Sequence, residues 1–376
     1  MRLVPRNSVA FVLGLVVIAA CAFGSFLTEA PNRLTSGYPL SLGEAADKPL
    51  LMVLVSCGVA LLAGSFAPAT KRNALALLAI AMTALLYLFF TAGQIATTIM
   101  ASAPAATRVS FGWAFWTSGA CLAILIFLAL QKRETWMRLV IVAVVAVALT
   151  LMARAGQFDG LSLMREYIAR QNDFAVELIR HCLLVLISVG IALAIGVPLG
   201  IYVARTQGAG KVIFGTLNLL QTVPSIALFG LLIAPLSALG LGGIGMVPAV
   251  IALVLYALLP IVRNTQTGII GVDRFLIDAA AGMGMNSRQI FWRVELPLGM
   301  PVFVAGLRIV IVQTIGLAVV AALIGAGGLG SFVFEGIGEY AIDLVLLGAI
   351  PAILLALTAD FLLALTASLL ERKRTA

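Results

Sequence analysis

The chain has 376 residues, of which 62% are apolar and 11% are charged, whereas soluble domains carry roughly 25% charged residues. Apolar runs of about 20 residues recur along the whole length, and each is long enough to cross a bilayer as a helix. The net charge of +8 does not indicate nucleic-acid binding, because the basic residues lie at the ends of the apolar runs, as in membrane proteins. We therefore expect an all-α, polytopic membrane protein, since lipid leaves no partner for an unpaired backbone amide.

Ten transmembrane helices are predicted, five on each side of a boundary near residue 174. In chain order they cover residues 7–27, 50–69, 74–98, 111–130, 137–153, 176–204, 212–234, 246–262, 302–324 and 342–369. The polar stretch 154–175 between the two halves reads as an external linker with room for a short surface helix. We thus expect two domains, an N-terminal five-span extension over 1–173 and a C-terminal membrane domain over 174–376.

The distribution of basic residues predicts the orientation. With the N-terminus inside, most of the 24 lysines and arginines fall on the cytoplasmic side. Both termini are therefore expected on the cytoplasmic side of a bacterial inner membrane. The first apolar run follows two arginines and could be read as a signal peptide, but its length suits a retained span better. The long polar stretch 264–300 is then cytoplasmic.

Metal and cofactor sites are not expected in this chain. The four cysteines, Cys21, Cys57, Cys121 and Cys182, all lie inside apolar runs without C-x-x-C spacing, and His181 is the only histidine. Such cysteines are usually small core residues.

The cytoplasmic stretch 264–300 predicts a helix–turn–helix. A short helix should begin after Asp273, and its small residues 279–280 would allow a partner surface to approach closely. Gly284 permits a sharp turn, Ser287 can cap the second helix, and Pro297 is expected to end that helix and redirect the chain towards the membrane.

The spacing in this stretch resembles the coupling loop of prokaryotic ABC importer permeases, E-A-A-x3-G-x9-I-x-L-P. The matching positions are Asp278, Ala279, Ala280, Gly284, Val294, Leu296 and Pro297. Asp for Glu and Val for Ile are the two departures, and both keep the chemistry. The resemblance implies a type I importer permease fold in the C-terminal half, and a loop that docks into a separate ATPase subunit.

Segments 221–225, 256–265 and 325–330 are similar to permeases for glycine betaine, choline and related osmoprotectants, and the N-terminal extension resembles the long permease of the Yeh-type osmoprotectant system. The resemblance implies a dimer of ABC ATPases, a second permease (a shorter homologue or this chain itself) and a periplasmic substrate-binding protein as partners. ATP should bind to the ATPase partner, because Gly210-Lys211 is followed by Val212 and no phosphate loop G-x-x-x-x-G-K-[ST] is present.

Two features suggest a translocation path or gate. Pro224 within a predicted span should free a backbone carbonyl, which Thr222 and Ser225 could satisfy, and the broken helix either lines the path or is a kink for packing. Arg308 and Asp360 lie about 9 Å and about 15 Å into their spans from the cytoplasmic end. Either they form an ion pair near a cytoplasmic gate, or each side chain reaches the interface separately.

Other functions remain open alternatives. A permease of the same class could import another small solute, such as an amino acid. An ion-coupled secondary transporter would favour intramembrane carboxylates, for which Asp360 is the one good candidate.

A membrane enzyme would need a cluster of catalytic groups that the sequence lacks. The Gly325-x-Gly327-x-x-Gly330 pattern needs a preceding strand to bind a dinucleotide. The four tryptophans form no aromatic cage for a quaternary ammonium group, so we expect such a cage on the separate binding protein.

Overall fold

The computed structural model describes residues 5–33, 35–68, 70–131, 133–206 and 208–375. The chain divides into two compact units, Met1–Ala169 and Arg170–Ala376. Among the described residues, eight helices are long and apolar enough to cross a membrane, and nine if one bent pair counts as a single span. These findings confirm a multi-pass helical membrane protein.

Unit 1 is a bundle of apolar helices. Its elements are α1 (Ser8–Phe23), α2 (Leu42–Ala45), α3 (Lys48–Phe66), α4 (Lys71–Ser102), α5 (Trp113–Gln131), α6 (Thr135–Arg154) and α7 (Ser162–Ala169). Helix α1 packs on α3 and α5, and α4 packs on α3, α5 and α6. None of the 20 residues of α6 is buried within the chain, so this helix presents its apolar surface to lipid or to another protein.

A small antiparallel sheet joins the loops at one end of unit 1. Its strands are β1 (Ser25–Ala30), β2 (Tyr38–Ser41) and β3 (Arg108–Phe111), in the order β2-β1-β3. Phe26 and Leu27 of the central strand are fully buried. The sheet was not predicted. It also explains why the first apolar helix ends at Phe23, since Ser25 already pairs with β2.

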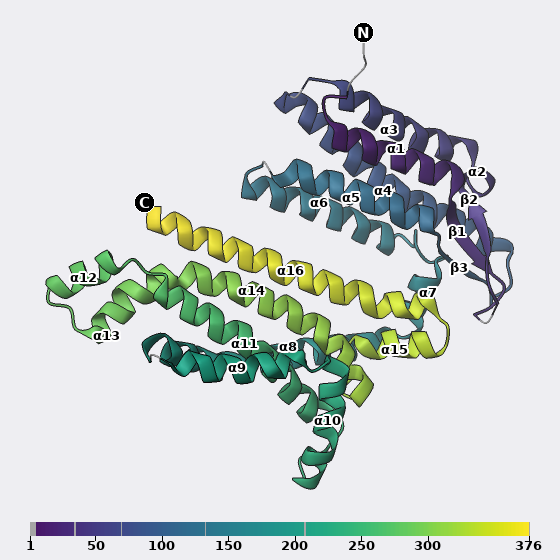
Figure 1. Cartoon of the computed structure of the whole chain (residues 1–376). Helices are drawn as coiled ribbons and strands as arrows, with labels where there is room; N and C mark the ends of the chain where they lie inside the picture. The colour runs from purple at the N-terminus through teal and green to yellow at the C-terminus, as the bar shows by residue number, and fades with distance from the viewer. Residues whose placement is uncertain (1–4, 34, 69, 132, 207, 376) are drawn as a thin grey trace. The chain divides into compact units, whose positions relative to one another are not determined.

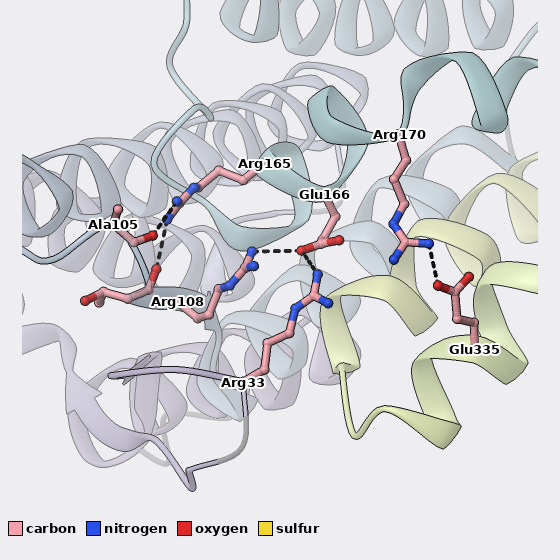
Figure 2. A network of polar contacts seen from close by, with 8 residues as sticks. Arg33, Ala105, Arg108, Arg165, Glu166, Arg170 and Glu335 are labelled. Atoms are coloured by element: carbon pink, nitrogen blue, oxygen red, sulfur yellow. Dashed lines mark hydrogen bonds and ion pairs between the residues drawn. The ribbon is translucent and has the colours of Figure 1, made fainter.

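A buried carboxylate holds α7 against this sheet (Figure 2). The side chain of Glu166 on α7 is only 4% exposed and forms ion pairs with Arg33 and with Arg108 of β3, the latter at 2.8 Å. The neighbouring Arg165 donates to the backbone carbonyls of Ala105 and Thr107 at 2.7 and 2.8 Å. These contacts fix the end of unit 1 from which the chain continues into the second unit.

Unit 2 contains the remaining helices. They are α8 (Gln171–Arg205), α9 (Ala209–Thr222), α10 (Ser225–Ala238), α11 (Met246–Ile270), α12 (Arg274–Gly282), α13 (Ser287–Ile290), the π-helical turn η1 (Phe291–Glu295), α14 (Leu296–Val320), the 3-10 turn η2 (Ala321–Ile324), α15 (Gly330–Gly338) and α16 (Ile342–Thr375). Helices α11, α14 and α16 lie side by side, with α12 and α13 at one end of the unit and α15 at the other (Figure 1).

Helix α11 is the centre of unit 2. It packs on α8 and α14. In its most apolar 18-residue segment 61% of the residues are buried, against 33% or less in the other long apolar helices of the described residues. Glycines allow this close packing, as in many membrane helices. A Cβ on Gly196 of α8 would lie 2.7 Å from Ile261, and one on Gly299 of α14 would lie 2.4 Å from the carbonyl oxygen of Gly268.

The seventh predicted span, 212–234, is not one straight helix. Helices α9 and α10 meet at Val223–Pro224 with a bend of 101°. The physical reason is that proline lacks the N–H that an uninterrupted helix would need and its ring clashes with the preceding turn.

Candidate coupling and transport site

The loop between α11 and α14 forms a helix–turn–helix, here called the coupling loop (residues 264–300). Helix α12 begins after Asp273, whose carboxylate accepts a hydrogen bond from the N–H of Phe275 at 2.9 Å. Gly284 has φ +81°, a left-handed conformation that favours glycine, and its Cα faces open space. Local sequence alone therefore explains the shape of the loop.

Two details of the loop differ from the sequence prediction. The second helix is capped by Asn286 rather than Ser287, because Asn286 and Gln289 exchange hydrogen bonds of 2.9 Å in a capping box. Pro297 does not end that helix. It lies in the first turn of α14, where a missing N–H is tolerated, and the π-helical turn η1 carries the helix through without a break from Ser287 to Ile324.

The predicted motif residues are distributed over the coupling loop, from α12 to the start of α14. Asp278, Ala279 and Ala280 lie on α12, Gly284 in the turn, Val294 in η1, and Leu296 and Pro297 in the first turn of α14.

The coupling loop exposes an apolar surface. Phe275 is 75% exposed, Met283 72% and Leu276 41%, next to the exposed Ala279, whereas Ala280 is buried inside the loop. The sequence analysis did not predict this apolar surface. Large apolar side chains that flank small residues on a polar loop are typical of a surface that another protein covers.

The base of the coupling loop is tied to α8. Glu295, at the end of η1, is 3% exposed at its side chain and forms an ion pair with Arg205, the last residue of α8. This pair was not predicted, because 90 residues separate its members.

Residues at the break between α9 and α10 form hydrogen bonds with α11. The hydroxyl of Tyr256 on α11 donates to the carbonyl oxygen of Val223, and the side-chain amide of Gln221 donates to the carbonyl oxygen of Tyr256 at 2.9 Å. The carbonyl four residues before Pro224, that of Leu220, accepts from the N–H of Val223 at 3.3 Å, so the hydroxyl of Tyr256 satisfies a second carbonyl at the break.

Thr222 and Ser225 lie on either side of that break. The Thr222 hydroxyl donates to the carbonyl oxygen of Leu219 in the last turn of α9, at 2.7 Å. Ser225 is the first residue of α10, directly after Pro224. All three predicted residues, Thr222, Pro224 and Ser225, are therefore at the bend, and whether they line a path stays a prediction.

Arg308 of α14 and Asp360 of α16 form a bidentate ion pair. The Nε and Nη2 atoms of Arg308 donate to Oδ1 and Oδ2 of Asp360 at 3.0 and 2.9 Å. Their side chains are 33% and 43% exposed within the chain. The structure thus contains the predicted pair, in the fork geometry that gives the strongest carboxylate contacts.

The glycine-rich segment 325–330 is a tight turn at the other end of the unit. Gly325, Gly327 and Gly328 all have φ between +75° and +84°. The N–H of Gly328 donates to the carboxylate of Glu177, which also pairs with Arg180 at 2.9 Å. Since η2 precedes this turn and α15 follows it, it has no strand before it and does not form a dinucleotide site.

Both halves of the chain match models of known protein families. Residues 5–164 match the N-terminal domain of the ABC transporter permease YehY, and residues 196–375 match the inner membrane component of binding-protein-dependent transport systems.

Characterised relatives match the second half. The chain is 42% identical over 177 residues to the carnitine transport permease protein OpuCB of Listeria monocytogenes, covering 47% of this chain and 78% of the relative. It is 45% identical over 169 residues to the osmoprotectant import permease protein OsmW of Salmonella typhimurium, covering 45% and 78%. The glycine betaine/carnitine/choline permease OpuCB of Bacillus subtilis is 41% identical over 169 residues, covering 45% and 75%.

A solved structure of the inward-facing methionine transporter MetNI is 21% identical, with a TM-score of 0.48, and covers 52% of this chain and 96% of its own. It is too distant to bear on function. The family matches and the relatives agree with the coupling loop, and the chain belongs to the transmembrane permeases of osmoprotectant ABC importers.

Proposed function

We propose that this chain imports quaternary ammonium osmoprotectants, such as glycine betaine, by passing the motion of an ATPase pair to its spanning helices. Three relatives with this kind of substrate, each at least 41% identical over the permease half, support the substrate class. The basic residues favour an orientation with both termini and the coupling loop on the cytoplasmic side of the bacterial inner membrane.

The observation that carries the mechanism is the coupling loop and its continuous connection to the membrane helices. Phe275 and Met283 offer an exposed apolar surface for a groove of the ATPase. From Ser287 the helical stretch runs unbroken for 38 residues to Ile324, which is roughly 57 Å. A displacement of the loop would therefore reach the glycine turn 325–330 at the opposite end as a rigid-body motion.

The remaining site residues would act on the helices that move with this long helical stretch. The Arg308–Asp360 pair links α14 to α16, so both helices would move together. The bend at Pro224, beside Tyr256 of the central helix, would lie within the bilayer, and such breaks line paths in many transporters.

The partners follow from the same mechanism. Two ATPase subunits would bind ATP, a second permease or a second copy of this chain would complete the pathway, and a periplasmic binding protein would deliver the substrate. No cofactor is assigned to this chain itself. Selectivity for the solute would then come mainly from the binding protein.

Uptake into vesicles tests the proposal. Radiolabelled glycine betaine is added to vesicles that contain this chain co-expressed with its ATPase and binding protein, and Gly284→Asp is compared with the wild type. Gly208→Asp is the matched control, because Gly208 also has a positive φ and open space around it but lies in the α8–α9 loop.

We expect ATP-dependent uptake that Gly284→Asp abolishes and Gly208→Asp retains. Uptake of another solute with the same sensitivity would keep the importer mechanism and refute the osmoprotectant substrate. Betaine uptake driven by an ion gradient without ATP would refute the importer mechanism.

A further inference from the structure

Two adjoining hollows lie at the base of the coupling loop, where α8 ends and α14 begins. The inner one, of about 100 Å³, lies between α8, α11 and the start of α14. The outer one, of about 440 Å³, is lined by Ile201, Arg205, Ser287, Arg288 and Phe291. Ile201 and Phe291 line both hollows, so they form one site with an apolar and a polar part.

The inner hollow is apolar except at two positions. Its lining includes Val197, Met300 and Phe303, and a space with such walls favours a hydrocarbon group over water. One exception is Glu295, which is already paired with an arginine. The other is the buried hydroxyl of Thr265, which has no hydrogen-bond partner in the described parts of the chain.

An orphaned hydroxyl on a helix is unusual. Helical threonines commonly donate to the carbonyl four residues earlier, as Thr314 does to Val310 at 2.7 Å and Thr91 does to Tyr87 at 2.8 Å. Leaving a buried donor unpaired costs free energy. The Thr265 oxygen is itself buried in the wall of the hollow, so its side chain would have to rotate before it could donate to an acceptor on a ligand.

The outer hollow is positively charged. Arg205 shares its charge with Glu295, whereas Arg288 forms no ion pair with any residue that the structure describes. The Ser287 hydroxyl lies on the same wall. Two guanidinium groups and a hydroxyl beside one carboxylate leave a net positive site that suits a phosphate group.

The position of the site selects the source of that phosphate. Arg205 is the last residue of the spanning helix α8, and it pairs with Glu295 directly before α14 begins. Arg205 therefore lies where helices leave the bilayer, with Arg288 on the adjoining coupling loop, and basic pockets between spanning helices at the level of lipid head groups bind anionic lipids.

We propose that the paired hollows bind one anionic phospholipid. Its phosphate contacts Arg205 and Arg288, its ester carbonyl accepts the hydrogen bond of Thr265, and the first part of an acyl chain fills the apolar hollow. A bound lipid would stabilise the contact between the coupling loop and α8. This inference concerns binding alone and does not depend on which solute is transported.

Lipid titration of the purified full chain tests the proposal. The chain in non-ionic detergent receives phosphatidylglycerol, phosphatidylcholine or inorganic phosphate, and the midpoint of thermal unfolding and the mass of the intact protein–lipid complex are recorded. We expect phosphatidylglycerol to raise the midpoint and to remain bound as one molecule, and phosphatidylcholine to bind at least about tenfold more weakly.

Substitutions locate the lipid. Arg288→Gln should weaken phosphatidylglycerol binding about tenfold and Thr265→Val about fivefold. Arg293→Gln is the matched control, since Arg293 is exposed on the same helical stretch but lines neither hollow. Arg288 makes no ion pair within the described chain, so its replacement should leave folding intact.

Three results would overturn the proposal. Equal binding of the two lipids would refute charge recognition. Equal losses in Arg288→Gln and Arg293→Gln would refute the location. Stabilisation by millimolar inorganic phosphate that displaces the lipid, with no loss in Thr265→Val, would show an anion site without a lipid.

Discussion

Breaking the Arg308–Asp360 pair should uncouple α14 from α16. In Asp360→Asn the guanidinium of Arg308 loses a bidentate partner at 2.9–3.0 Å. A lone charge costs about 2.5–3.5 kcal/mol at the centre of a spanning helix on insertion scales, and less near the end, where Arg308 lies. Because the two side chains are 33% and 43% exposed, we expect about half of that, ~1–2 kcal/mol, to be lost from the unfolding free energy.

A double-mutant cycle measures this interaction directly. Unfolding in mixed micelles is followed for Asp360→Asn, Arg308→Gln and the double variant, and the uptake rate is recorded for each. The double variant should be more stable than the sum of the single losses predicts, with a coupling energy of about 1–2 kcal/mol. Thr358→Val, on an exposed position of the same helix, serves as control and should change neither quantity.

A coupling energy below about 0.5 kcal/mol would refute the pairing, because distant independent sites add within that margin. A second test is charge reversal. If Arg308→Asp and Asp360→Arg each abolish uptake and their combination restores none of it, the pair does not act as a unit in transport.

Three further outcomes follow from single contacts. Tyr256→Phe, which removes the donor to the Val223 carbonyl at the helix break, should cost about 1 kcal/mol of unfolding free energy and slow uptake severalfold, whereas Tyr202→Phe on an exposed position should change neither. Glu166→Gln should destabilise unit 1 by about 2–3 kcal/mol, because its two arginine partners lose a buried carboxylate; unchanged thermal unfolding would contradict this. Gly328→Ala should lower the thermal midpoint, since its φ is +84° and a Cβ would lie 3.1 Å from His181; a raised midpoint would contradict the strain.

The coupling loop was the most predictable part of the molecule, because its shape depends on neighbouring residues. A cap at Asp273, a left-handed glycine at Gly284 and seven motif positions within 20 residues all act locally. The two misassigned details, the cap at Asn286 and the continuation past Pro297, are also local. The first depends on which of two adjacent polar residues reaches back to the backbone, and the second on a π-helical turn that composition does not reveal.

Contacts between distant segments were not predictable. The Glu166 cluster joins residues 58 and 133 positions apart, and the small sheet of unit 1 pairs strands on either side of two spanning helices. The contact between the hydroxyl of Tyr256 and the carbonyl of Val223 was not predicted either, because nothing local indicates that these groups meet. Only the Arg308–Asp360 pair was inferred at long range, since two isolated charges at similar depths in an apolar chain have few possible partners.

Coupling between the loop and the ATPase is the central claim, and ATP hydrolysis by the reconstituted complex tests it most directly. Hydrolysis is measured with and without binding protein loaded with glycine betaine, for the wild type and for Gly284→Asp. We predict severalfold stimulation by the loaded binding protein in the wild type and none in Gly284→Asp, with Gly208→Asp stimulated like the wild type. Equal stimulation of the wild type and Gly284→Asp would contradict the account.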